Sequence, residues 1–503
     1  MSGLVGQVLL VAVLAVPAAG AAVVAVLRHD RAARLVGTVA AGLTLLAALP
    51  LVAGGDDAGA GTDPSPAVRP WHQVDLPWVP GLDLRFHLGV DGISWPLVVL
   101  TALLTLLCCG YTLWKVPSGG SGRALVALLL VVEVGILGTF LALDLVLFFV
   151  FFEVVLLPMY AIIVGWGGPD RYRAARKFAL YTLFGSVLLL VGVLVVVTAA
   201  GTADIVALTG GTGLSRGPQL AAFTLLALAF AVKSPLWPLH SWLPDAHTQA
   251  PTVGSVILAG VLLKMGTYGL IRVAVGVAPE GAEWAAPVLG VLAVAAILVG
   301  SLVCLAQTEL KRLIAYSSVG HMGFVLLGVA TLTGTGLRAA LIGNIAHGII
   351  TGLLFFLAGA IKDRAHTGDL ADLSGLRETA PRLAGLLGFA AVASLGLPGL
   401  AGFWGEAFAV VAAVRVGGPL WLTLAVLAAL GGALTAAYLL RLLRQVTHGR
   451  ASSAVAQVGP GVARAELLTW APLVLLTLAV GLAPILVLGV AQVPVDALLP
   501  GRP

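Results

Sequence analysis

Charged side chains are scarce in this 503-residue chain: Asp, Glu, Lys and Arg make up 10% of it, whereas soluble domains carry about 25%. Hydrophobic residues make up 59%, and the mean hydropathy is +1.06. A soluble core does not use so much apolar surface, so the composition excludes an ordinary soluble domain and predicts a chain embedded mostly in a bilayer. The formal charge of +5 is scattered over short loops, which excludes a basic surface for nucleic acid.

Cysteine is also scarce. Cys108, Cys109 and Cys304 all lie in apolar runs, and their number and spacing provide neither a disulfide framework nor a metal or iron–sulfur motif. The chain lacks GxGxxG, Walker and CxxC patterns, so we expect no nucleotide, metal or redox cofactor in it. The N-terminus lacks the basic start of a signal peptide, and its apolar run reaches Leu27. We interpret this run as the first membrane span.

Long apolar runs are what the sequence has in abundance. Hydropathy, interrupted by Gly, Pro and charges, predicts an all-α polytopic membrane protein with about fourteen transmembrane helices. The seventh and twelfth segments each contain a break. The expected spans are 4–27, 35–53, 92–114, 123–143, 145–165, 177–200, 219–238, 253–276, 285–306, 309–332, 336–361, 382–413, 418–444 and 467–490.

Basic residues are distributed unevenly among the loops between these spans. Of the 28 Lys and Arg residues, nineteen fall in odd-numbered loops and seven, Arg272 among them, in even-numbered loops or the tail. The positive-inside rule therefore puts the odd loops in the cytoplasm and both termini outside. We expect a multi-pass protein of the cell inner (plasma) membrane. The long second loop, 54–91, fits an external segment and carries five acidic residues: Asp56, Asp57, Asp63, Asp75 and Asp83.

A few ionisable side chains interrupt the apolar spans. A charge at membrane depth costs several kcal/mol unless it is paired or hydrated, so each is a functional candidate by default. The alternatives are a static salt bridge, a capping carboxylate or a hydrogen-bonded core histidine. The candidates are Glu133, Glu153, Lys233, Lys264 and Glu406, with His321 and His347 as titratable companions and Asp144 at a predicted helix junction.

Lys233 is the most informative of these residues. Pro235 and Pro238 follow it, and because they disrupt the helical hydrogen-bond ladder, they free carbonyls that can bind water. Glu153 is the expected partner of Lys233. Burial lowers the pKa of a lysine and a neighbouring carboxylate raises it. Making or breaking the pair can therefore load or release a proton. Glu406 follows a similar break, "SLGLPGLAGFWGEAF".

The spacing of the candidates predicts an internal repeat. Glu153 and His321 are 168 residues apart, and Lys233 and Glu406 are 173 apart. We expect two five-helix repeats, helices 4–8 and 9–13, which an odd number of spans forces into inverted orientations. The expected units are therefore two N-terminal helices with the external loop (1–91), a third helix (92–122), the repeats as two proton half-channels (123–276 and 285–444), and a cytoplasmic loop with the last helix (445–503).

Several motifs resemble one known family. "FFEVVLLPMYAIIVGWGG", "FAVKSPLWPLHSWLPDAHTQAPTVGSVILAGVLLKMGTYGLIR", "YSSVGHMGF" and "NIAHG" resemble the antiporter-like membrane subunits of respiratory complex I, the proton-pumping NADH:quinone oxidoreductase. The resemblance covers roughly 90–445. Glu406 stands where sister subunits typically carry lysine, and no long lateral helix follows the last span. Both features favour the M-type branch, the counterpart of mitochondrial subunit 4.

The resemblance implies a role for each candidate. Lys233 would be the central proton carrier and Glu153 its charge partner. The proton path would continue through Lys264 and His321, with His347 as a relay and Glu406 as the terminal site. It also implies a non-redox subunit of a translocase, without NADH, flavin or iron–sulfur binding, that lies among flanking antiporter-like subunits and lipids. The alternatives are a subunit of a multi-subunit Na⁺(K⁺)/H⁺ antiporter, and a scaffold whose buried charges serve assembly.

Overall fold

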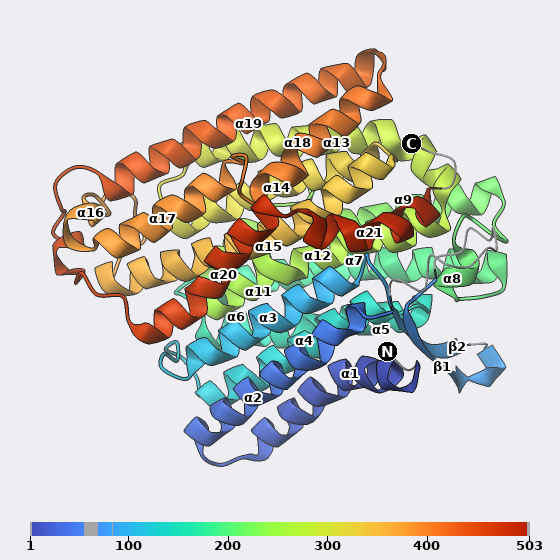
Figure 1. Ribbon diagram of the computed structural model, residues 1–503, viewed down its shortest axis with the longest axis horizontal. Coiled ribbons are helices and arrows are strands. Elements are labelled where there is room, and N and C mark those ends of the chain that lie inside the picture. Colours follow the sequence, from blue (N-terminus) through green and yellow to red (C-terminus); the bar gives the residue numbers. More distant parts are fainter. Residues whose placement is uncertain (1–2, 55–68, 83, 500–503) are drawn as a thin grey trace.

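The chain folds into one bundle of long helices that lie roughly side by side (Figure 1). The computed structural model describes residues 3–54, 69–82 and 84–499; Asp56, Asp57, Asp63 and Asp83 of the predicted external loop lie outside these ranges. Twelve described helices are long and apolar enough to cross a membrane. The predicted class, an all-α polytopic membrane protein, is therefore confirmed, whereas the count of fourteen spans stays a prediction.

Most predicted spans correspond to a single continuous helix or to helices joined end to end. The fifth span bends at Val155, between α5 and α6, and the eighth contains two π-helical stretches, η4 and η5. These elements are α1 (Gly3–Val26), α2 (Asp30–Ala48) with η1 (Leu49–Val52), α3 (Trp95–Thr112), α4 (Gly122–Leu141), α5 (Leu145–Val154), α6 (Leu156–Trp166), α7 (Arg171–Ala200), α11 (Thr252–Ile257), η4 (Leu258–Leu262), α12 (Leu263–Gly269), η5 (Leu270–Val275), α13 (Pro279–Ala306), α14 (Leu310–Ala330), α15 (Gly334–Ala365) and α19 (Gly418–Thr447).

The seventh and twelfth segments are interrupted, as predicted. In the seventh, α9 (Arg216–Lys233) and α10 (Trp242–Gln249) flank the prolines that follow Lys233. In the twelfth, α17 (Pro381–Ser394) and α18 (Gly402–Val416) flank a turn in which Gly396 and Gly399 have φ of +70° and +90°. Glycine takes this left-handed conformation without a Cβ clash, so these residues allow the reversal between the two halves.

The last span was predicted incorrectly. The structure has two helices, α20 (Arg464–Leu482) and α21 (Ile485–Leu498), in place of one helix over 467–490. Pro484 lies between them and has no N–H to continue the ladder of α20. Three short helices lie between the longer ones: α8 (Ile205–Leu208), α16 (Leu376–Thr379) and η6 (Val455–Gln457).

The predicted external loop contains a β-hairpin that the sequence analysis did not anticipate. Strands β1 (His72–Val79) and β2 (Leu84–Val90) pair antiparallel, with η3 (Pro80–Leu82) between them. His87 anchors the hairpin: its Nδ1 lies 2.9 Å from Asp204 Oδ2, and its carbonyl accepts a 2.9 Å hydrogen bond from Leu143 N. The hairpin therefore docks where α4 gives way to α5.

A backbone motif recurs at a constant spacing. Asp144, the N-cap of α5, forms a β-bridge with Asp204, and Glu309, the N-cap of α14, forms one with Asp369. Both residues of the first bridge precede those of the second by 165 positions. The two bridges lie at opposite ends of the bundle, beside α8 and toward α16 respectively (Figure 1). This recurrence supports the predicted repeat, although the inverted relation of its copies stays a prediction.

The position of Arg272 in the structure corrects the count of basic residues in the loops. It does not lie in an external loop but is buried in η5, where its Nη2 donates to Asp91 Oδ2. Asp91 Oδ1 also accepts the backbone N–H groups of Ile93 and Ser94 at the start of α3. A buried cation needs such a partner, so this ion pair joins the C-terminal part of the eighth span to the start of α3.

We predict that breaking this pair destabilises the fold more than removing both charges. Arg272→Met leaves a buried carboxylate unpaired, which costs about 3–5 kcal/mol. The double variant Arg272→Met/Asp91→Asn should recover part of that loss. The measurement is the thermal unfolding midpoint in detergent, with Lys115→Met as the control, because its partly exposed pair with Asp363 contributes only about 0–1 kcal/mol. Equal midpoints for the single and double variants would contradict the coupling.

We also predict that acid releases the hairpin only well below neutral pH. Burial alone would raise the pKa of Asp204, but hydrogen bonds from His87 and backbone N–H groups lower it below its ordinary value of 3.8. Because the pKa of Asp204 is lower in the folded than in the unfolded protein, its ionised form stabilises the fold at pH values above the unfolded pKa. This stabilisation is lost as the pH falls through the folded pKa. Hydrogen-exchange protection of β2 should therefore persist at pH 5 and decline below about 3.8. Asp204→Ala should lower the protection already at pH 7, and unchanged protection there would exclude this anchor.

Candidate functional site: a buried row of titratable side chains

Lys233 is the last residue of α9 and is 2% exposed. Its Nζ has no hydrogen-bond partner within the described residues and lies 4.8 Å from the centre of the Phe152 ring. The predicted contact with Glu153 is not formed. Glu153 is close enough for its charge to act on Lys233, but it accepts a hydrogen bond from Ser186 Oγ on α7. The Phe152 ring takes the place beside the ammonium that a carboxylate would occupy, so the predicted pair interacts across a gap.

Lys264 lies on α12, between the two π-helical stretches, and is fully buried. Its Nζ donates a 2.6 Å hydrogen bond to the carbonyl oxygen of Ala259 and lies 2.6 Å from His347 Nδ1. Ala259 is five residues earlier, inside η4. A π-helical turn alters the usual backbone pairing and is common at functional sites, so this local distortion explains how a mid-span lysine finds a carbonyl.

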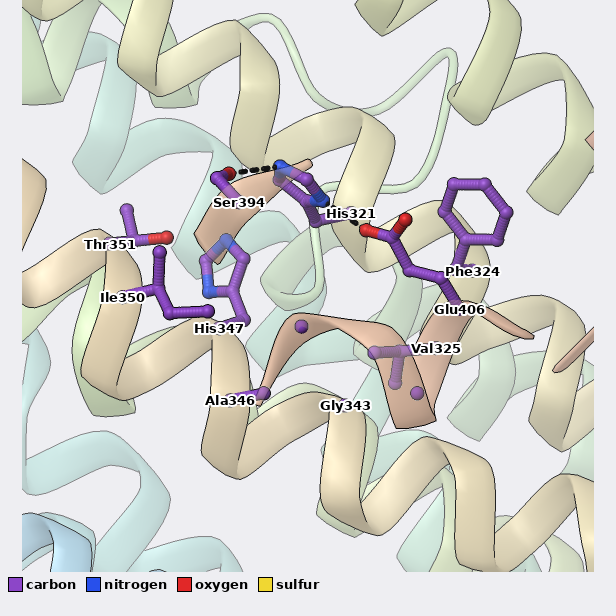
Figure 2. Close-up of a pocket in the computed structure, with 12 residues that line it drawn as sticks. His321, Phe324, Val325, Gly343, Ala346, His347, Ile350, Thr351, Ser394 and Glu406 are labelled. Atoms are coloured by element: carbon purple, nitrogen blue, oxygen red, sulfur yellow. Dashed lines mark hydrogen bonds and ion pairs between the residues drawn. The ribbon is translucent and has the colours of Figure 1, made fainter. Parts of the chain in front are cut away.

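His321 and Glu406 are in direct contact. His321 Nδ1 lies 2.6 Å from Glu406 Oε1, and Ser394 Oγ lies 2.9 Å from His321 Nε2 (Figure 2). Ser394 ends α17 and Glu406 lies in the first turns of α18. The break in the twelfth segment therefore brings both polar side chains onto one histidine of α14.

The two contacts join into one row. The rings of His321 and His347 are 5.9 Å apart, centre to centre. They border a cavity of about 20 Å³ that Ser394, Thr351 and Glu406 also line (Figure 2), and a cavity of this size can hold a water molecule. Lys264, His347, His321 and Glu406 thus form a nearly continuous line of titratable groups that crosses the boundary between the two predicted repeats.

Glycines bring the Lys233 group close to this row. A Cβ added at Gly266 would lie 2.5 Å from Ser234 Oγ, and one at Gly269 would lie 2.3 Å from the Phe230 ring. Helix α12 can therefore pack tightly against the end of α9 only because these positions lack side chains. The structure thus places Lys233 and Lys264 on two helices in close contact, with the break after Ser234 beside them.

The remaining candidates have different surroundings. Glu133 is fully buried on α4, and neither of its carboxylate oxygens has a partner within the described residues. Asp144 caps α5 by accepting hydrogen bonds from Val146 N and Leu147 N; burial raises its pKa against these bonds. The hydroxyls of Ser317 and Ser318 bond to a carbonyl of their own helix.

Sequence reasoning missed two buried cationic or titratable residues. Lys311 was counted with the cytoplasmic loops, but it is 6% exposed and its Nζ donates to the carbonyl of Ala250 at 3.1 Å. His247 was passed over because it follows the second break-forming proline in a short polar helix. It is fully buried, and its ring stacks on Phe355. The signal available for His247 was its position at the end of "HSWLPDAH", between Lys233 and Lys264.

Known proteins resemble this chain over most of its length. Residues 142–431 match the family described as "NADH:quinone oxidoreductase/Mrp antiporter, TM". NADH-quinone oxidoreductase subunit M of Rhodobacter capsulatus is 41% identical over 489 residues, which cover 94% of this chain and 92% of that protein. NAD(P)H-quinone oxidoreductase chain 4 1 of a Synechococcus strain is 44% identical over 376 residues, covering 74% of this chain and 71% of that protein.

Solved structures share the fold. A chain of respiratory complex I from Thermus thermophilus with bound NADH superposes with a TM-score of 0.84 at 32% identity, covering 97% of this chain and 99% of that one. A chain of the Mrp complex from Dietzia sp. DQ12-45-1b gives 0.85 at 24% identity, covering 99% and 98%, and this likeness concerns the fold alone. The chain therefore belongs to the NADH:quinone oxidoreductase/Mrp antiporter transmembrane family.

Proposed function

We propose that this chain is a proton-translocating subunit of the membrane arm of an NADH:quinone oxidoreductase. It moves H⁺ from the cytoplasm outward through buried Glu, Lys and His side chains, driven by quinone reduction elsewhere in the complex. The observation that carries the proposal is the row Lys264–His347–His321–Glu406, in which neighbouring groups touch or border a cavity large enough for a water molecule. The relatives named subunit M and chain 4 support it.

The chain itself has no redox step in this proposal. Its three cysteines are buried and free, and the described residues contain no group of His, Cys, Asp and Glu arranged to hold a metal ion. We assign NADH, flavin and iron–sulfur chemistry to other subunits, and quinone reduction as well. The partners are the other membrane-arm subunits, including flanking antiporter-like chains, together with lipids in the plasma membrane.

Proton transfer follows from the order of the groups. Glu153 acts on Lys233 across a gap, so a shift of Glu153 or of Phe152 changes how firmly the lysine holds its proton. Each 1.4 kcal/mol of altered interaction changes that equilibrium about tenfold. A proton released at Lys233 passes by water to Lys264, whose Nζ already faces His347 Nδ1. It then reaches His321 and Glu406 on the far side of the repeat boundary.

The two halves would serve as two half-channels. We propose inverted repeats over 123–276 and 285–444, flanked by the N-terminal helices and external loop (1–91), the third helix (92–122) and the C-terminal part (445–503). The bridges Asp144–Asp204 and Glu309–Asp369, at opposite ends of the bundle, support this division. With the odd loops in the cytoplasm, both termini lie outside.

A Na⁺(K⁺)/H⁺ antiporter subunit is the second candidate, because the Mrp chain shares the fold. The 41% identity to a subunit M and the carboxylate at Glu406 favour the oxidoreductase. Co-purification separates the two: a complex I subunit copurifies with an NADH-oxidising activity, whereas an Mrp-type subunit copurifies with cation/proton exchange alone.

We predict that Lys233→Ala and Glu153→Gln each lower proton pumping by the assembled complex in liposomes about tenfold. The first removes the carrier, and the second removes the charge that acts on it. Arg441→Ala, on an exposed position of α19, is the control and should pump normally. Native gels establish assembly. Normal pumping with either site variant, in a fully assembled complex, would refute the assignment.

We predict that His321 and Glu406 act in series. His321→Gln and Glu406→Gln should each reduce pumping about tenfold, and the double variant should be no slower than the worse single variant. Ser394→Ala removes only the hydrogen bond to His321 Nε2 and should cost about fivefold or less. Losses that multiply in the double variant would show that the two residues act on separate steps.

A further inference from the structure

A polar cavity opens at the end of the bundle where α3, α6 and α15 end and α14 begins. It has a volume of about 430 Å³. The charged side chains that line it are those of Lys115, Lys311, Lys362 and Asp363. Lysines therefore outnumber carboxylates among the described residues of the lining, and we call this space the lysine cavity. The positive-inside rule predicts that this end of the bundle faces the cytoplasm.

Two of the three lysines are already paired. Lys115 Nζ forms an ion pair with Asp363, and Lys362 Nζ lies 3.7 Å from Glu309 Oε1, which is not part of the lining. All four side chains are partly exposed, so water also solvates them. These two pairs are neutral as a whole, and the third lysine, Lys311, carries the excess positive charge of the lysine cavity.

Lys311 differs from the other two lysines because it is buried. It is 6% exposed and forms no ion pair within the described residues. Its Nζ donates one hydrogen bond, of 3.1 Å, to the carbonyl oxygen of Ala250, which also lines the cavity. An ammonium group has three N–H donors, so two remain without an acceptor in the part of the chain that the structure describes. A buried cation without a counterion is costly, and an anion in the lysine cavity would lower that cost.

Two neutral polar groups in the lining also lack partners. Trp166, which ends α6, is 8% exposed, and its Nε1 is buried without an acceptor among the described residues. The Oγ1 of Thr248, on α10, is likewise buried and has no hydrogen-bond partner there. An indole N–H can only donate, and leaving a buried donor unpaired costs stability. Ammonium, indole and hydroxyl donors from three helices therefore line one cavity, and the group that they lack is an acceptor.

We propose that the lysine cavity binds a phosphate group, with Lys311 as its charge partner and Trp166 Nε1 and Thr248 Oγ1 as neutral donors. A phosphate group has negatively charged oxygens that accept hydrogen bonds from several directions at once, and lysine binds it as a point charge. The volume leaves room for the phosphate together with water.

Two sources carry this group: inorganic phosphate and the headgroup of an anionic phospholipid. Basic pockets between membrane helices on the cytoplasmic side are typical sites for such headgroups. The inference goes beyond the proposed function, because the bound group carries no proton through the membrane. It links α6 and α10 of the first predicted repeat to α14 of the second, so occupation of the site should stabilise the fold.

The test measures the thermal unfolding midpoint of the full chain, stripped of lipid in a neutral detergent. Saturating inorganic phosphate should raise the midpoint by about 2–5 °C, and sodium chloride of equal ionic strength should not. Lys311→Met keeps an unbranched side chain without the charge and should abolish the rise. Arg173→Met is the matched control: it removes an exposed cation from the first turn of α7, at the same end of the bundle, and should keep the rise.

A second arm of the test distinguishes the two sources. The chain is placed in phosphatidylcholine nanodiscs with and without phosphatidylglycerol. A rise with phosphatidylglycerol but not with inorganic phosphate, absent in Lys311→Met, assigns the site to a lipid headgroup; the reverse pattern assigns it to free phosphate. Either result supports the site, and no Lys311-dependent rise with either probe overturns it.

Trp166→Phe keeps the proposal testable if Lys311→Met does not fold. This change removes the indole N–H and keeps an aromatic ring. It should weaken binding of the probe that raises the midpoint about tenfold, because a hydrogen bond to a charged group is lost. An unchanged midpoint titration for Trp166→Phe would overturn the assigned site.

Discussion

The cost of holding ionisable groups in an apolar interior is the constraint on which the rest of this structure depends. A lone charge at membrane depth is expensive, and the cost falls when the group finds a partner, a carbonyl or water. Arg272 and Asp91 meet the constraint as a fixed pair. Lys264 meets it with one carbonyl and one histidine, neither of which carries a fixed negative charge. Lys233 meets it least completely, with an aromatic face and a carboxylate that acts from a distance.

The backbone supplies what the side chains lack. The seventh and twelfth spans are broken by proline and glycine, and the eighth contains π-helical turns. Each of these three irregularities lies beside a titratable group. The break after Lys233 is flanked by Ser234, the twelfth-segment break positions Ser394 and Glu406, and η4 offers the Ala259 carbonyl to Lys264. Irregular backbone is tolerated at membrane depth only where protein or water covers it. The irregular segments and the buried ionisable groups are therefore parts of one arrangement. The free backbone groups lower the cost of burying the side chains, and the surrounding protein covers the irregular backbone.

The sequence was sufficient for the class, the two breaks and most of the row. Hydropathy identified the spans because apolar runs long enough to cross a bilayer are rare elsewhere, and Lys264 and Glu406 stood out because nothing around them is charged. The geometry of the Lys233 site could not be predicted from the sequence. No sequence pattern shows that the Phe152 ring lies beside Lys233, where Glu153 was expected. The hairpin was missed because two short strands in a polar loop give a weak sequence signal. The buried position of Arg272 was missed because the sequence does not distinguish a cation in a loop from a cation in an ion pair near the end of a span.

His247 shows why a buried titratable residue is hard to find in a short polar helix. Its neighbours in sequence are polar and predict a loop, yet the break folds them back into the bundle against α15.

The central claim, that the buried Lys, His and Glu side chains exchange protons through trapped solvent, is tested most directly by locating ordered water in a high-resolution structure of the assembled complex. Ordered waters are expected to link Lys233 to Lys264 and His321 to His347. Dry packing between these side chains, with no solvent density in the cavity beside His321, would contradict it.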